Sequence, residues 1–380
     1  MAKLLLTVNQ DYLLKICQLH DVYDGKIGYL PLLKNFNDHN NIVKLNSVWS
    51  SQPAYMPVDR TLSTKLPFQQ CVPRVWQVPQ TKRTLSEAMA QRAMLLAAQG
   101  QTVNVLWSGG IDSTAVLTAF LQNVNHQQLR VIYSPWSTYE HPELFEFLKS
   151  FESLSMVDIS GTRYMNWDFD GIFVSGDGGD EMTASLDSSF IDSHSIDVLH
   201  SPWQDFVFRQ TQDHGLIEFC QQHFSQAGRD IRTVLEARWW FYACFKVRSI
   251  LNQKLELLFD SDPVDWTRLV GFYDCEEFES YIYWNIEHCI TGNSYSGWKQ
   301  VLKDYANDFQ NFDKWYQTAV KNHSTQVSVY MAKKRALKQQ HWLALFEDGT
   351  RISTPSLPVL THKEYFATAD LGWIFDHEHI

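Results

Sequence analysis

Two serines, two glycines and an aspartate follow a short apolar stretch at residues 103–107. The order is Ser108-Gly109-Gly110-Ile111-Asp112-Ser113, with Thr114 next. Glycines allow a sharp turn that brings backbone N–H groups close to an anion, and serine hydroxyls are further donors. A helix that starts at this point would add its positive end. The pattern predicts a phosphate-binding loop whose nucleotide contacts come from Ser108, Gly109, Gly110, Asp112, Ser113 and Thr114.

Asp112 has a different expected role from the serines and glycines around it. A carboxylate repels phosphate, but it is a good oxygen ligand for the Mg²⁺ that accompanies a nucleotide. The loop therefore predicts that the chain binds ATP together with Mg²⁺. The commoner loop Gly-x-x-x-x-Gly-Lys-Ser/Thr does not occur in the sequence, which disfavours a kinase or a P-loop ATPase.

A second cluster of glycines and acids follows the apolar residues 171–174. It reads Ser175-Gly176-Asp177-Gly178-Gly179-Asp180-Glu181, which is too flexible and too acidic for a protein core. In a parallel sheet, ligands bind at the carboxyl ends of the strands, so both loops are expected to face one crevice. Asp112 and Asp180 would then share the metal ion.

These two motifs resemble those of a known enzyme family. Ser-Gly-Gly-x-Asp-Ser resembles the signature of the ATP pyrophosphatase superfamily, and Ser-Gly-Asp-Gly-Gly-Asp-Glu resembles the second motif of the asparagine synthetase C-terminal domain. That branch also contains β-lactam synthetases. The resemblance extends from about residue 84 to the low 330s, and Gly271-Phe272-Tyr273-Asp274 is similar to a degraded Pro-Phe-x-Asp segment of the family.

The resemblance implies cleavage of ATP between its α and β phosphates and activation of a substrate oxygen as the adenylate. It implies that Asp112 and Asp180 hold Mg²⁺ and that Ser175 and Gly176 join the first loop in contacting pyrophosphate or AMP. Asp177 would face the acceptor and take a proton from the attacking amine. The family's late lysine, which neutralises developing charge, corresponds to Lys333 or Lys334.

Two departures from the family concern the acceptor and the nitrogen source. Residues 182–186 read Met-Thr-Ala-Ser-Leu where asparagine synthetases have a Phe-Gly-Gly-Tyr-like run, which indicates a remodelled acceptor side. The sequence begins Met1-Ala2-Lys3, without the cysteine that a glutaminase of this family exposes at position two. We therefore expect nitrogen from ammonia, from an amine substrate or from a separate donor subunit.

The elements that must position these loops alternate between strands and helices. Apolar runs predict strands at residues 103–107, 129–133, 156–159 and 171–174, and Thr84-Leu85-Ser86-Glu87 is a capping box that opens a helix. The alternation predicts an α/β fold with a doubly wound parallel sheet of the adenine nucleotide alpha hydrolase-like type. We expect a small N-terminal lobe (1–83) and an ATP pyrophosphatase domain (84–380) in which residues 190–380 form a mostly helical lobe.

Composition and charge narrow the function classes. An apolar content of 44% is enough for a stable core, and the net charge of −11 without a basic run disfavours strong nonspecific binding to nucleic acid. The six cysteines form no Cys-x-x-Cys pair, and no run approaches the roughly 18 apolar residues of a membrane span. We expect a cytoplasmic protein with no membrane partner.

The sequence as a whole predicts an ATP-dependent, AMP-forming ligase that joins a small carboxylate, or a similar oxygen, to ammonia or an amine. One alternative is a superfamily member that adenylates a base or nucleotide of a nucleic acid. Another is an ATP-binding or assembly protein that keeps the loops without the acceptor chemistry. The acceptor and the oligomeric state are left open.

Overall fold

The computed structural model describes the chain in separate stretches. They are residues 4–7, 41–42, 44–45, 48–49, 59–63, 75–159, 169–179, 194–246, 268–286, 299–318, 341–346 and 351–354. The chain forms two compact units, one of residues 76–323 and one that joins residues 1–75 to residues 324–380. This division differs from the boundary after residue 83 that the sequence predicts, and it also groups the two ends of the chain.

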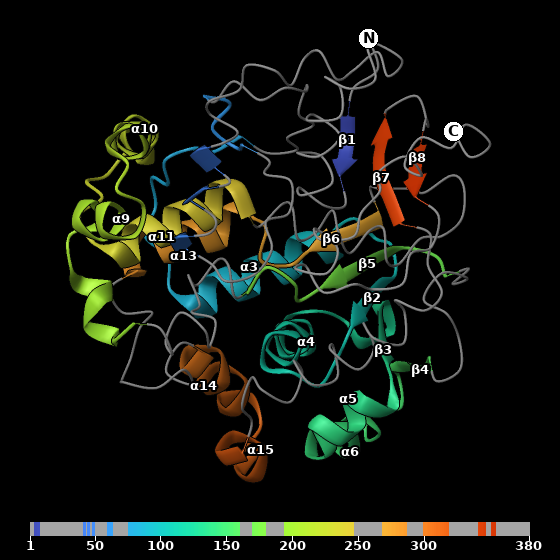
Figure 1. The fold of residues 1–380 in the computed structure, drawn as a ribbon. Helices are drawn as coiled ribbons and strands as arrows, with labels where there is room; N and C mark the ends of the chain where they lie inside the picture. Colours follow the sequence, from blue (N-terminus) through green and yellow to red (C-terminus); the bar gives the residue numbers. More distant parts are fainter. Residues whose placement is uncertain are drawn as a thin grey trace. The chain divides into compact units, whose positions relative to one another are not determined.

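The larger unit is built on a five-stranded sheet in which all strands are parallel. The strands are β2 (Val103–Leu106), β3 (Leu129–Tyr133), β4 (Ser155–Asp158), β5 (Ile172–Ser175) and β6 (Leu269–Gly271), in the order β4-β3-β2-β5-β6 (Figure 1). The prediction of a parallel sheet in an α/β fold is confirmed. Strand β6, which has only three residues, was not predicted and lies in the region 190–380 that is expected to be mostly helical.

The two central strands are made mostly of buried apolar residues. Val103 and Val105 of β2 are completely buried, and Ile172, Phe173 and Val174 of β5 are at most 5% exposed. Strands covered on both faces read as mostly apolar runs, and Asn104 is the buried polar exception in β2. Hydrophobic burial therefore fixes β2 and β5 side by side in the middle of the sheet, and with them the loops that follow.

A polar cluster holds the amino-terminal end of the same sheet. The Asn104 amide donates to the carbonyl oxygens of Asp170 and Ile172 over 2.7 and 3.0 Å. The Asp170 carboxylate accepts from the Thr102 hydroxyl at 2.8 Å and pairs with Arg130 at 3.0 Å. These two contacts lower the pKa of Asp170, the Thr102 hydrogen bond having the larger effect. Asp170 thus has a structural role at the end of β5 opposite to Asp177.

Helices connect the strands and continue after them. The first group is α3 (Leu85–Ala97), α4 (Ile111–Asn123), the 3-10 turn η2 (His126–Gln128), α5 (Pro135–Glu140) and α6 (Pro142–Leu148). The second group is η4 (Ile196–His200), α9 (Trp203–Thr211), α10 (His214–Phe224), η5 (Ser225–Ala227), α11 (Val234–Phe241), the π-helix η6 (Tyr242–Lys246), α13 (Glu276–Asn285), α14 (Gln300–Phe309) and α15 (Asp313–Thr318). Helix α4 contacts β2, α3 and α14 (Figure 1).

The start of α3 confirms the predicted capping box. The Thr84 backbone N–H donates to the Glu87 carboxylate over 2.7 Å, and the Glu87 N–H donates to the Thr84 hydroxyl over 3.2 Å. The next turns of α3 place Arg92 against the end of β6, where its guanidinium donates to the carbonyl oxygens of Gly271 and Phe272 over 3.1 and 3.2 Å. The helix thereby fixes the turn that follows β6.

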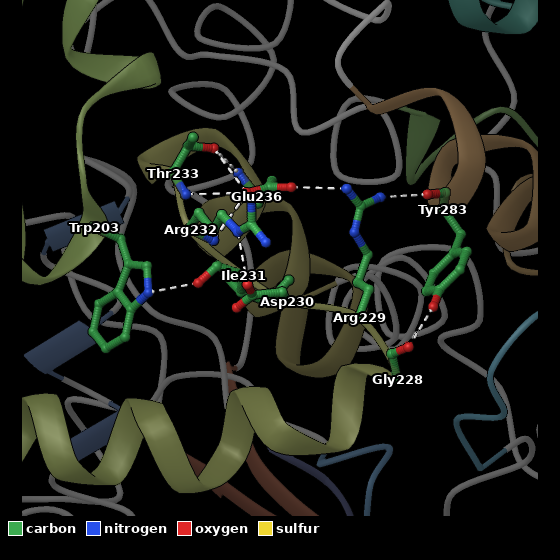
Figure 2. A network of polar contacts seen from close by, with 9 residues as sticks. All are labelled: Trp203, Gly228, Arg229, Asp230, Ile231, Arg232, Thr233, Glu236 and Tyr283. Atoms are coloured by element: carbon green, nitrogen blue, oxygen red, sulfur yellow. Dashed lines mark hydrogen bonds and ion pairs between the residues drawn. The ribbon is translucent and has the colours of Figure 1, made fainter.

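A buried carboxylate ties the helical part of this unit together. Glu236, 5% exposed, accepts from the guanidinium of Arg229 at 2.8 Å and from the backbone N–H groups of Arg232 and Thr233 at 2.9 and 3.0 Å (Figure 2). Arg229 also donates to the carbonyl oxygen of Tyr283 over 2.5 Å. The network thus joins the start of α11 to α13, and α13 also packs on α3.

The other unit contains a three-stranded antiparallel sheet. Its strands are β1 (Leu4–Thr7), β7 (His341–Phe346) and β8 (Arg351–Thr354), in the order β1-β7-β8. Two of these strands belong to the region 190–380, which was expected to be mostly helical. None of the helices in the described part of the chain is long and apolar enough to cross a membrane.

Candidate active site

The first glycine-rich loop lies between the end of β2 and the start of α4. Gly109 has a φ of +85°, a conformation that L side chains rarely adopt. A Cβ at Gly109 would lie 2.5 Å from the carbonyl oxygen of Ser137 in α5. Only glycine fits at this position, and its absent side chain allows α5 to pack directly against the loop.

Hydrogen bonds between the two serines close this loop. The Ser108 N–H donates to the Ser113 hydroxyl over 3.1 Å, and the two hydroxyl oxygens are 2.9 Å apart. The Ser113 hydroxyl also reaches the carbonyl oxygen of Gly110 at 3.1 Å. Ser108 is exposed whereas Ser113 is 6% exposed. Ser108 is therefore the exposed residue of this loop, Gly109 is buried and Gly110 is half-buried, and the hydroxyl pair fixes the shape of the loop.

The start of α4 directs its backbone toward the same point. Gly110 is the N-cap residue and has no side chain to cap the first-turn N–H groups, so these donors and the positive helix end are suited to an anion. Thr114 is completely buried, accepts a hydrogen bond from the Trp107 indole at 3.1 Å and lies 3.4 Å from the Gly109 carbonyl oxygen. The Thr114 side chain thus supports the loop from within the core.

The second loop continues directly from β5. The Ser175 hydroxyl donates to the Asp177 carboxylate, and the Asp177 N–H donates back to the Ser175 hydroxyl over 3.1 Å. Gly178 has a φ of +89°, which allows the chain to turn sharply after Asp177. Ser175 is 4% exposed and Asp177 is half-buried. The buried serine therefore fixes the direction of the Asp177 carboxylate.

The two loops meet because their strands are neighbours. Leu106 of β2 pairs with Ser175 of β5, so both loops leave the sheet at the same edge. A Cβ at Gly176 would lie 2.9 Å from the Ser113 backbone nitrogen. The strand order also reverses here, with β3 and β4 on one side of β2 and β5 and β6 on the other. In open α/β sheets, the crevice at such a reversal is where ligands bind.

Asp112 in the first turn of α4 is contacted from three separate segments. A Cβ at Gly179 would lie 2.7 Å from Asp112 Oδ1. The Tyr273 hydroxyl, held by the turn after β6, donates to the Asp112 carbonyl oxygen over 3.0 Å. Lys299, only 5% exposed, forms an ion pair with Asp112 Oδ2. Asp112 is therefore the residue at which the two loops, β6 and α14 converge.

Asp112 is the described carboxylate at which the sequence predicts a magnesium ion bound together with a phosphate. No cluster of three or more His, Cys, Asp or Glu side chains suited to a metal occurs among the residues that the structure describes. Mg²⁺ is commonly held by one or two carboxylates plus substrate phosphates, so such a cluster is not required. Gly179 packs closely on Asp112 Oδ1, and this oxygen is buried from solvent.

Glu140, the last residue of α5, adds an acidic group beside the first loop. A Cβ at Gly109 would lie 2.8 Å from Glu140 Cβ, and a Cβ at Gly110 would lie 3.7 Å from Glu140 Oε2. Burial raises the pKa of Glu140 to about 7. Near neutral pH this carboxyl group is therefore partly protonated, and only its ionised form would repel a phosphate in the loop.

The predicted site residues fall into three groups. Thr114 stands apart, because its side chain is completely buried and contacts Trp107 within the core. The structure brings together Ser108, Gly109, Gly110, Asp112, Ser113, Ser175, Gly176 and Asp177. Asp180, Lys333 and Lys334 lie outside the described residues.

Three further residues at the site were not predicted as site residues. Tyr273 stood in a segment that resembled a family motif, whereas no sequence pattern pointed to Glu140 or Lys299. Lys299 lies 187 positions from Asp112, and only the packing of α14 on α4 brings the two together.

Comparison with protein-family models finds no match for this chain, and comparison with curated proteins finds none either. The relationship to asparagine synthetases is therefore a prediction from the two motifs.

Proposed function

We propose that the chain is an ATP-dependent, AMP-forming ligase of the asparagine synthetase type, with an adenine nucleotide alpha hydrolase-like fold. It would adenylate a small carboxylate, or a similar oxygen, and form an amide with ammonia or an amine. The proposal depends mainly on one observation: the loop after β5 packs its glycines directly on the first turn of α4, next to Asp112, where the strand order reverses.

The first loop supplies what a pyrophosphate needs. The exposed Ser108 and the backbone of Gly109 and Gly110 lie at the positive end of α4, so they would bind the β and γ phosphates. Asp112 would hold Mg²⁺, with Asp180 as the second carboxylate expected from the motif. When bound, the cation would offset the charge of the pyrophosphate that leaves.

The second loop supplies the acceptor side. The Ser175 hydroxyl holds the Asp177 carboxylate in one orientation, so Asp177 can accept the proton that the attacking amine loses. Holding the amine next to the adenylate makes the attack effectively unimolecular. Nitrogen would arrive as ammonia, as an amine substrate or from a separate donor subunit.

A second candidate function is favoured by the ion pair between Lys299 and Asp112. A protein in which this pair is permanent would bind nucleotide weakly or without metal, and would work as an ATP-binding or assembly protein without turnover. The net charge of −11 gives no comparable support to a nucleic-acid substrate.

The test is to measure the products formed from Mg-ATP by the purified chain with pools of small carboxylates and amines. AMP and pyrophosphate are expected, and Asp112→Asn should abolish them because the charge is lost while the shape is kept. Asp170→Asn is the matched control, since Asp170 flanks the opposite end of β5 and should leave the reaction unchanged. ADP and phosphate as products would refute the proposal, and ATP binding without turnover would favour the second candidate.

A further inference from the structure

The environment of Lys299 is unusual for a lysine because the side chain is buried. Lys299 is 5% exposed, it stands at the N-cap position of α14, and its ammonium group contacts the carboxylate of Asp112. A buried ammonium is costly unless a carboxylate compensates it. The ion pair with Asp112, the residue that the proposed function needs as the metal ligand, therefore offsets part of the cost of burying Lys299.

The backbone of Lys299 is fixed, whereas its side chain is long. The Tyr305 hydroxyl of α14 donates to the Gln122 side chain in the last turn of α4 over 2.7 Å. Lys299 contacts the first turn of α4 and Tyr305 the last, so α14 runs alongside α4 in the same direction. A lysine carries its charge on a flexible four-carbon stem. Its ammonium group can therefore change partners without movement of the helix.

A divalent cation and the Lys299 ammonium cannot both occupy the Asp112 carboxylate at low cost. Asp112 Oδ2 contacts Lys299 and Oδ1 faces Gly179, so a metal at this carboxylate would bring a second positive charge next to the buried ammonium. Asp112 is itself part of the predicted phosphate-binding loop, residues 108–113. A bound nucleotide would offer the ammonium a new anionic partner within the same site.

We infer that Lys299 is an exchangeable counter-ion: it pairs with Asp112 in the nucleotide-free protein and transfers to the nucleotide phosphates when Mg²⁺ takes the carboxylate. This inference rests on the proposed function. Its consequence is that metal and nucleotide bind together, because the metal alone must compete with the Lys299 ion pair for the Asp112 carboxylate. Lys299 is then a phosphate-binding residue that precedes Lys333 and Lys334 in the sequence.

The experiment measures the binding of Mn²⁺ without nucleotide, by electron paramagnetic resonance, and the binding of Mn-ATP, by calorimetry, for wild type and Lys299→Met. If Lys299 exchanges partners, its replacement by Met should change the affinities for Mn²⁺ alone and for Mn-ATP in opposite directions. Mn²⁺ alone should bind roughly tenfold more tightly because its competitor is gone, and Mn-ATP should bind roughly tenfold more weakly because the phosphates lose a cation. Lys299→Arg should restore the wild-type affinities for Mn²⁺ alone and for Mn-ATP.

The matched control is Lys303→Met, one turn further along α14. Lys303 is also 5% exposed, but its ammonium lies 5.2 Å from the centre of the Tyr316 ring. This variant should change neither affinity. A second control is Asp112→Asn combined with Lys299→Met, in which the gain in Mn²⁺ affinity should vanish because it acts through Asp112. Thermal melting of each variant verifies that it is folded.

The possible results separate the two ideas. Suppose that wild type binds Mn-ATP, and that Lys299→Met either weakens the binding of both Mn²⁺ and Mn-ATP or changes neither. Lys299 is then a structural residue, and the exchange is refuted while the proposed function survives. If Lys303→Met behaves like Lys299→Met, the effect belongs to α14 as a whole and the exchange is also refuted. A wild-type protein that binds no nucleotide overturns the proposed function and the exchange together.

Discussion

Replacing Gly179 by alanine tests how closely the two loops approach each other. The backbone of Gly179 is outside the left-handed region, so alanine is allowed there, but its Cβ would lie 2.7 Å from Asp112 Oδ1 and 3.0 Å from Tyr273 Cε2. Restoring an ordinary contact of 3.4 Å requires a movement of about 0.7 Å. The atom that moves is the oxygen to which we assign the metal.

This displacement sets the size of the expected effect. Mg²⁺ requires near-ideal octahedral geometry with oxygens at about 2.0–2.1 Å, so a shift of the carboxylate by a third of that length should weaken its coordination. We expect the Kd for Mg-ATP to rise about tenfold, which corresponds to about 1.4 kcal/mol. Stability should fall by less than about 1.5 kcal/mol, because the end of a side chain yields more easily than the backbone.

For Gly176→Ala, in the same loop, we expect the loss of stability to be the larger effect and the loss of Mg-ATP affinity the smaller one. Its Cβ would lie 2.9 Å from the Ser113 backbone nitrogen, so a backbone segment must move, at a cost of about 1–3 kcal/mol. For a unit of this size each kcal/mol lowers the Tm by about 2–4 °C. Gly215→Ala in α10 is the control for both variants, since its Cβ would meet only the Asp213 carboxylate at 3.3 Å.

The assays are calorimetric titration with Mg-ATP and thermal denaturation of the same preparations. A Gly179→Ala protein with wild-type affinity for Mg-ATP would refute the reasoning, because the added methyl group could not then be displacing a metal ligand. So would a loss of affinity in Gly215→Ala, which lies on another helix.

Three further predictions concern pH and stability. Burial raises the folded-state pKa of Glu140 to about 7. The protonated form therefore contributes its full stability below about pH 4.5, and this contribution is lost as the pH rises through 7. Glu140→Gln should therefore be more stable than wild type at pH 8, by about 1 kcal/mol after solvent screening, and the difference in urea midpoints should nearly vanish at pH 4.5. Glu236→Ala removes the partner of Arg229 and should cost about 3 kcal/mol in urea unfolding, whereas a cost below about 1 kcal/mol would contradict the network in Figure 2. Gly171→Ala combines a φ of +78° with a Cβ 1.9 Å from the Thr102 carbonyl oxygen, so it should lower the yield of folded protein sharply; a normal yield and Tm would show that the start of β5 is placed differently.

Local patterns in the sequence were sufficient for much of the fold. The apolar runs at residues 103–107 and 171–174 become β2 and β5, because strands buried on both faces need mostly apolar side chains. The capping box at Thr84 opens α3, because its two hydrogen bonds join residues only three positions apart. β6 was missed because a strand of three residues carries almost no periodic signal.

The two glycine-rich loops can be predicted from the sequence, since tight turns and helix starts depend on neighbouring residues. Ser108, Gly109, Asp112 and Asp177 were predicted as site residues on this basis. The packing of Gly176 and Gly179 against α4, and the presence of Lys299 and Glu140 at the site, are visible only in the folded chain. Their positions result from the packing of α14 on α4 and of α5 on the first loop, and packing between segments far apart in the sequence leaves no mark in the spacing of residues along the chain.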